Sequence, residues 1–374
     1  MTESRNVLRN VLLALVPVAC LPYLLLKISW LCGGTAGIPE GSTLRDGGST
    51  LWAINLLTVA MDATVILLAV ALARPWGRRL PAGLIAVPLW GASGLLGPIL
   101  VAFPVQTAFG MLTGGTGDTG GSGGSGGGTD DKGAETLLDG WVWATVYTGF
   151  TVQGIVLGTL FVLYVRERWG TLLRTRLSAL PVPARPSART RAGLLVAALG
   201  ALPVAALNVM WAAGAETGLN PERIAQRDAS THIVELTYLL FIALAVAGTA
   251  WLALGRGNPR LWLPLAASWT GSGVMACWGG WLLMGALSGG GRTLGDSATG
   301  LMQCTYALQM ATGLLLAALG ARALTRLAGA GTDAGAGTDA GAGTDAGARA
   351  GVGAARVGAG TAAGQTGATG KGSV

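Results

Sequence analysis

The sequence predicts an all-α membrane protein with eight transmembrane helices, built as two parallel four-helix repeats with both termini on the cytoplasmic side. Three observations carry this prediction. Only 11% of the 374 residues are charged and 51% are hydrophobic, whereas a soluble domain usually carries about a quarter charged residues. The hydrophobic residues form long blocks, and the connectors between blocks alternate between arginine-rich and acidic. The order of prolines, tryptophans and glycines is shared by the two halves of the chain.

Eight apolar blocks are long enough to cross a bilayer. A helical span needs about 20 apolar residues to cross roughly 30 Å of hydrocarbon, and its backbone must be hydrogen-bonded internally. Continuous blocks rich in Leu, Ala and Val indicate helices and not the alternating strands of a barrel. The predicted spans are residues 10–31, 51–73, 80–103, 141–165, 192–213, 233–254, 261–287 and 299–321.

These spans divide the chain into four parts. They are a first membrane repeat over 1–170, a basic cytoplasmic linker over 171–191, a second membrane repeat over 192–326 and a Gly/Ala-rich cytoplasmic tail over 327–374. An outer loop at 113–133 is also rich in glycine. The loop and the tail have too few apolar residues to bury a core, so we expect both to be disordered.

The basic residues predict which side of the membrane each connector faces. The connectors on the predicted inner side carry 16 basic residues and those on the outer side carry 5. Every alternate connector follows the positive-inside rule. The net charge of +7 therefore reflects topology. We expect the partner to be the lipid bilayer of the cell membrane and not nucleic acid.

An internal duplication relates the two halves. Matching residues keep their order through four spans, although their separation shrinks along the chain because the first half carries the glycine-rich loop. The matches are Pro22, Trp30, Gly33 and Gly37 with Pro203, Trp211, Gly214 and Gly218 (181 residues apart), the motifs WGASG from Trp90 and WTGSG from Trp269 (179 apart), and Tyr147 and Gly154 with Tyr306 and Gly313 (159 apart). Four spans per repeat is an even number, which predicts parallel repeats related by an axis along the membrane normal.

Two ionisable residues lie well inside predicted spans, and they form the candidate buried charge pair. Lys27 lies about 6 Å below the outer end of the first span, and Asp62 lies about 16 Å into the second, at 1.5 Å per residue. Charges within a bilayer usually face the protein interior and pair. One interpretation is a static salt bridge, or a lysine that reaches up to the interface. The other is that Asp62 is a proton or cation site.

Other polar residues in the spans are candidates to line a cavity, although hydrogen bonding between helices is the common role of such residues. They are Asn55, Gln153, Asn208 and Gln309. No catalytic residue, metal site or cofactor is predicted. The chain contains neither a P-loop nor an H-E-x-x-H sequence, its four cysteines lack metal-ligand spacing, and His232 is its single histidine.

The stretch LPYLLLKISWLCGG from Leu21 to Gly34, together with the overall composition, resembles uncharacterised multi-pass integral membrane proteins of high-GC actinobacteria. This resemblance implies no activity.

The leading functional hypothesis is transport of a small solute or ion, without enzymatic chemistry. A membrane-embedded partner or scaffold subunit and a membrane lipid or glycan transferase are the alternatives. Transport predicts a cavity that includes Asp62, a partner subunit predicts an exposed groove of small residues, and a transferase predicts converging outer carboxylates.

Overall fold

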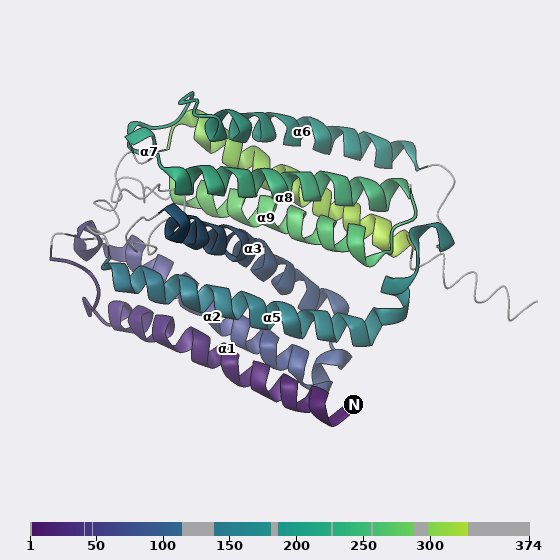
Figure 1. The fold of residues 1–374 in the computed structure, drawn as a ribbon, viewed down its shortest axis with the longest axis horizontal. Helices are drawn as coiled ribbons and strands as arrows, with labels where there is room; N and C mark the ends of the chain where they lie inside the picture. The colour runs from purple at the N-terminus through teal and green to yellow at the C-terminus, as the bar shows by residue number, and fades with distance from the viewer. Residues whose placement is uncertain are drawn as a thin grey trace, which may run out of the picture.

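The described part of the chain contains eight long helices that lie side by side in the computed structural model (Figure 1). The structure describes residues 2–40, 42–46, 48–113, 138–180, 186–225, 227–255, 257–287 and 298–327. The long helices are α1 Thr2–Leu31, α2 Gly48–Ala73, α3 Ala82–Thr113, α5 Gly140–Arg174, α6 Ala188–Ala212, α8 Ala229–Leu254, α9 Trp262–Leu287 and a last helix, Gly300–Leu327. Short helices lie between them: η1 Thr43–Asp46, η2 Pro75–Arg79, η3 Leu177–Ala179 and α7 Pro221–Ala225.

Seven of the long helices are long and apolar enough to cross a membrane, which confirms the prediction of a helical multi-pass membrane protein. The helix outside this group is α9, whose 26 residues include four tryptophans and five glycines. These residues lower its mean hydropathy, but they do not expose it. Ten residues of α9 are buried, including the run from Gly271 to Ala276.

The helices match the predicted spans at most ends and extend beyond them at others. The prediction ended the third span at residue 103, but α3 continues through Pro104 to Thr113. It ended the fourth span at residue 165, but α5 continues to Arg174, past a break in helical geometry at Trp169. Hydropathy marks only the stretch that suits hydrocarbon, whereas backbone hydrogen bonds continue into polar sequence. One proline removes a single donor and does not have to end a helix.

Successive connectors lie at opposite ends of the bundle (Figure 1). The N-terminus and the α2–α3, α5–α6 and α8–α9 connections share one end, on the right in the view. We call it the arginine-rich end, because its described arginines are Arg9, Arg74, Arg78, Arg79, Arg166, Arg168, Arg174, Arg176, Arg189, Arg191, Arg260, Arg322 and Arg326. At this end the α5–α6 and α8–α9 connections also hydrogen-bond through Leu177 N to Pro259 O at 2.9 Å.

The same helix ending occurs at two places 181 residues apart. At the end of α1, Trp30 Nε1 donates to Ala36 O at 2.8 Å; at the end of α6, Trp211 Nε1 donates to Thr217 O at 3.0 Å. Both turns use glycines at positive φ, at +86° and +72° in the first and +99° and +74° in the second. Glycine adopts this left-handed region without steric cost. The helices that follow, α2 and α8, are both 26 residues long and also begin 181 residues apart.

The two tryptophan–serine motifs face each other where α3 crosses α9. Trp90 Nε1 donates to Ser272 Oγ at 3.2 Å, and Trp269 Nε1 donates to Ser93 Oγ at 2.9 Å. Each motif therefore donates one hydrogen bond to the other and accepts one from it. This reciprocal pattern is typical of a two-fold relation. Between them, a Cβ built on Gly94 would lie 2.5 Å from the carbonyl oxygen of Gly273. Only glycine permits this backbone approach.

Packing divides the bundle into two groups joined by α3. In the first group α1, α2 and α5 contact one another, and in the second α6 contacts α8 and α8 contacts α9. Helix α3 contacts α5 on one side and both α8 and α9 on the other. An apolar cluster fills this junction, with Ile99 from α3 against Phe241, Val274 and Trp278.

Two predicted segments fall mainly or wholly outside the described residues. They are most of the glycine-rich loop, 114–133, and the tail from residue 328 onward. The predictions made for them stay predictions.

Candidate functional site

A line of polar side chains follows the interior of the first helix group, starting near the end opposite the arginine-rich end. Lys27 of α1 is buried and donates from Nζ to Asn55 Oδ1 of α2 at 2.7 Å. The ammonium also lies 5.0 Å from the ring centroids of both Tyr23 and Trp30. Cation–π contacts of this kind stabilise a charge that has lost part of its water.

A further contact continues this line toward the middle of α2. Gln153 Nε2 of α5 donates to Asp62 Oδ1 at 3.5 Å, and Thr58 Oγ1 donates to the backbone oxygen of Asn55 at 2.9 Å. Asn55, Thr58 and Asp62 are three and four residues apart, a spacing that places them on one face of a helix. We call the Lys27–Asn55 and Gln153–Asp62 contacts, with Thr58 between them on α2, the polar ladder.

Asp62 is the innermost charged member of the ladder. It lies near the middle of the 26-residue helix α2, and only 4% of the residue is exposed. Its second carboxylate oxygen, Oδ2, is buried without a hydrogen-bond partner. A buried carboxylate normally has all its oxygens paired, and an exception calls for an explanation.

The predicted charge pair is buried at both positions, but it is not in direct contact. Within the described residues, the ion pairs closer than 4.0 Å do not include Lys27 with Asp62. Asn55 holds the lysine instead. It precedes Asp62 by seven residues, or about 10 Å along the helix axis, which is farther than the bonded ammonium reaches.

The remaining predicted polar residues do not join the ladder. Asn208 lies in α6 and donates from Nδ2 to Val204 O of the same helix at 2.7 Å. Gln309 is buried in the last helix. The structure therefore brings Lys27 with Asn55, and Asp62 with Gln153, in the first helix group, and leaves Asn208 and Gln309 in the second.

A second charged cluster, which the sequence analysis missed, lies at the same end of the second helix group. Arg223 of α7 pairs with Glu235 of α8 at 3.1 Å, and their side chains are 10% and 3% exposed. Arg223 Nη1 also donates to the hydroxyl of Tyr306 at 3.0 Å. Its guanidinium lies 6.0 Å from the ring centroid of Trp211. This cluster is a buried ion pair whose groups are satisfied by each other.

One signal for this cluster was present in the sequence. Glu235 lies inside the predicted span 233–254, and a carboxylate in that place calls for a partner. The partner was hidden because Arg223 counted as a connector residue. The structure folds the connector back as α7, so that both helix groups place a cation beside the matching tryptophan, Lys27 beside Trp30 and Arg223 beside Trp211.

Three acidic residues at this end of the bundle have structural partners. Asp228 caps α8 by accepting from Thr231 N at 2.8 Å, and Asp139 Oδ2 accepts from Trp141 Nε1 at 3.3 Å. With Glu235 paired to Arg223, these three carboxylates serve a helix cap, a ring nitrogen and an ion pair.

No protein-family model, curated protein or solved structure matches the chain.

Proposed function

We propose that this protein transports protons across the cell membrane, with Asp62 as the carboxylate that takes up and releases the proton. In this proposal eight helices cross the bilayer, α9 included, and both termini are cytoplasmic. The single observation that carries the proposal is the unpartnered Oδ2 of Asp62, buried among helices long and apolar enough to span a membrane.

The orientation of the bundle supports this arrangement. The connectors at the arginine-rich end are the ones that the positive-inside rule assigns to the cytoplasm. Their separation from the acidic connectors at the opposite end is visible in the path of the chain (Figure 1). The polar ladder then starts near the outer face.

The matched turns after Trp30 and Trp211 and the reciprocal Trp90–Ser272 and Trp269–Ser93 bonds support a duplication with parallel repeats. Helices α1 and α6 run in the same direction (Figure 1), as repeats of four spans require. Asp62 belongs to α2, inside the first repeat. It does not lie at the junction between the repeats, where α3 and α9 approach closely through glycines.

An unpartnered carboxylate in a low-dielectric interior is costly as an anion, and it can be relieved by binding a proton or a cation. A proton fits this site better than a metal ion. The free oxygen that the ladder offers is Asp62 Oδ2, whereas hard cations prefer six or more oxygens.

Proton flux in proteoliposomes tests this function. The full chain is reconstituted in vesicles that contain a pH-sensitive dye, and a potassium diffusion potential drives protons inward. We expect flux with the wild-type chain and a loss of at least tenfold with Asp62→Asn, because an amide cannot carry the proton. Glu40→Gln is the matched control, since it makes the same change at an exposed outer position and should leave the flux unchanged. Equal flux in wild type and Asp62→Asn contradicts the proposal.

A further inference from the structure

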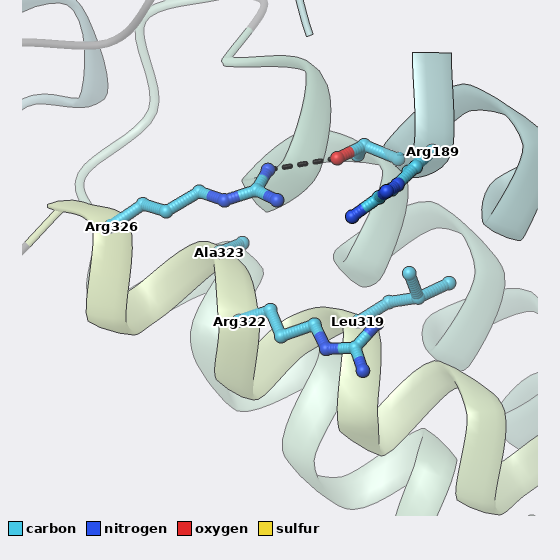
Figure 2. Close-up of a pocket in the computed structure, with 6 residues that line it drawn as sticks. Arg189, Leu319, Arg322, Ala323 and Arg326 are labelled. Atoms are coloured by element: carbon cyan, nitrogen blue, oxygen red, sulfur yellow. Dashed lines mark hydrogen bonds between the residues drawn. The ribbon is translucent and has the colours of Figure 1, made fainter. Parts of the chain in front are cut away.

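A cleft lined by three arginines lies at the arginine-rich end, between α6 and the last helix. Its volume is about 280 Å³, and it is lined by Arg189, Thr190, Leu319, Arg322, Ala323 and Arg326; we call it the arginine cleft. Figure 2 shows the Arg326 side chain extended from the last helix toward α6, with Arg189 extended from α6 toward the last helix. Arg326 Nη1 donates to Thr190 Oγ1 at 2.8 Å.

The described residues of the chain supply no negative charge to this cleft. None of its lining residues is acidic. The carboxylate side chain that the structure describes at the arginine-rich end is that of Glu167. It already pairs with Arg9 at 2.8 Å and lies 3.9 Å from Arg78. Three guanidinium groups thus share one cleft whose remaining lining residues are Thr190 and the apolar Leu319 and Ala323.

The corresponding place in the first half of the chain is a closed ion pair. Position 190 corresponds to Arg9 at the separation of 181 residues, and position 326 corresponds to Glu167 at the separation of 159. Where the first half joins Arg9 to Glu167, the second half joins Thr190 to Arg326. Each half therefore has one arginine at these two positions, but in the second half its partner is a threonine and not a carboxylate, so the arginine has no internal counterion among the described residues.

We propose that the arginine cleft binds a phosphate group, presented by an anionic phospholipid headgroup or by a soluble phosphate. Guanidinium groups present several donors in a rigid fork that matches phosphate oxygens. The N-terminus of α6 adds its dipole, because Thr190 lies in the first turn of that helix after the Ser187 cap. Leu319 and Ala323 suit the apolar part of a lipid. This inference does not depend on proton transport by Asp62.

Lipid retention tests the lipid source. The full chain is placed in nanodiscs of equal phosphatidylglycerol and phosphatidylcholine, transferred to detergent, and the bound lipid is counted by native mass spectrometry. We expect the wild type to retain phosphatidylglycerol at least fivefold over phosphatidylcholine. The preference should vanish in the cleft variant, Arg189→Ala/Arg322→Ala/Arg326→Ala. The control, Arg74→Ala/Arg79→Ala/Arg174→Ala, removes the same charge from exposed positions at the same end and should keep the preference.

A second arm tests soluble phosphate. Inorganic phosphate is added to lipid-free protein in detergent, against chloride at equal ionic strength, and the unfolding temperature is followed. A rise in the wild type and control that the cleft variant lacks supports the proposal, with a soluble phosphate as the source.

A second variant guards against loss of folding in the first. Thr190→Arg/Arg326→Glu rebuilds the ion pair of the first half and should fold, yet it should bind neither probe above one-fifth of the wild-type level. The proposal is overturned if the wild type shows no preference in either arm. It is also overturned if this variant binds as the wild type does, or if the control loses as much as the cleft variant.

Discussion

Breaking the buried Arg223–Glu235 pair on one side should destabilise the protein more than removing both partners. The pair is nearly inaccessible, with side chains 10% and 3% exposed, so either charge left alone stays buried. Removal of one partner of such a pair costs about 3–5 kcal/mol, whereas replacement of both by apolar residues is often neutral. Arg223→Met should lie at the upper end of this range, because Arg223 also donates to Tyr306 and lies beside Trp211.

The measurement is thermal unfolding in detergent of both single variants and of the double variant Arg223→Met/Glu235→Leu. Each kcal/mol moves the unfolding temperature of a large chain by about 2 °C. Arg223→Met should therefore lower it by about 6–10 °C, and Glu235→Leu by slightly less. The double variant should recover at least half of the larger loss.

Arg45→Met is the control, because Arg45 is an exposed arginine in the equivalent connector of the first half. Surface substitutions usually change stability by about 0.5 kcal/mol or less, so its unfolding temperature should stay within about 1 °C of wild type. If the two single losses simply add in the double variant, the groups do not interact and the reasoning from burial is wrong.

Three other predictions follow from contacts elsewhere in the chain. Lys27→Met should destabilise the protein by about 2 kcal/mol or more as it leaves buried Asn55 unpaired, and Asn55→Leu in the same chain should recover part of this loss in thermal unfolding. Gly94→Val should sharply reduce folded protein in membranes, because its Cβ would lie 2.5 Å from a carbonyl oxygen of α9, whereas Gly83→Val, which meets open space, should not. A cysteine at Ser178 should react with an impermeant thiol reagent only after the cells are opened; reaction in intact cells refutes a cytoplasmic arginine-rich end.

The features that the sequence predicted best are those set by local rules. Apolar length fixed the positions of the helices, since the hydrocarbon thickness demands about 20 residues regardless of neighbours. The turns after Trp30 and Trp211 were visible because left-handed backbone needs glycine, so Gly33 and Gly214 left a recognisable mark. The motifs at Trp90 and Trp269 were recognised as matching positions of the two halves, but their contact with each other was not predicted.

The partners of the buried charges were harder to predict, because pairing depends on rotation about the helix axis as well as on depth. The depths of Lys27 and Asp62 suggested a meeting, but Asn55 shares the face of α2 with Asp62 and lies closer to the lysine. Likewise, no hydropathy pattern predicts that Pro221–Ala225 folds back as a helix and buries Arg223. An arginine in a connector is expected to be solvent-exposed, and its burial becomes evident only from the tertiary fold.

If the two halves are aligned as the proposed duplication requires, they distribute their charges differently. At the end opposite the arginine-rich end, the second half is closed by Arg223 and Glu235, and it has Asn208 and Ala243 at the positions aligned with Lys27 and Asp62. The first half keeps an unpartnered carboxylate oxygen on Asp62, near the middle of α2.

At the arginine-rich end the assignment is reversed. The first half is closed by Arg9 and Glu167, and the second half carries the arginine cleft without a carboxylate. The first half thus holds an ion pair at the arginine-rich end and an unpartnered carboxylate oxygen near the middle of α2. The second half holds an ion pair at the opposite end and the arginine cleft at the arginine-rich end. Unsatisfied charge lowers stability unless a ligand or other interactions compensate for it. In our proposals these two unsatisfied sites, the Asp62 carboxylate and the arginine cleft, are the ones that bind a proton and a phosphate.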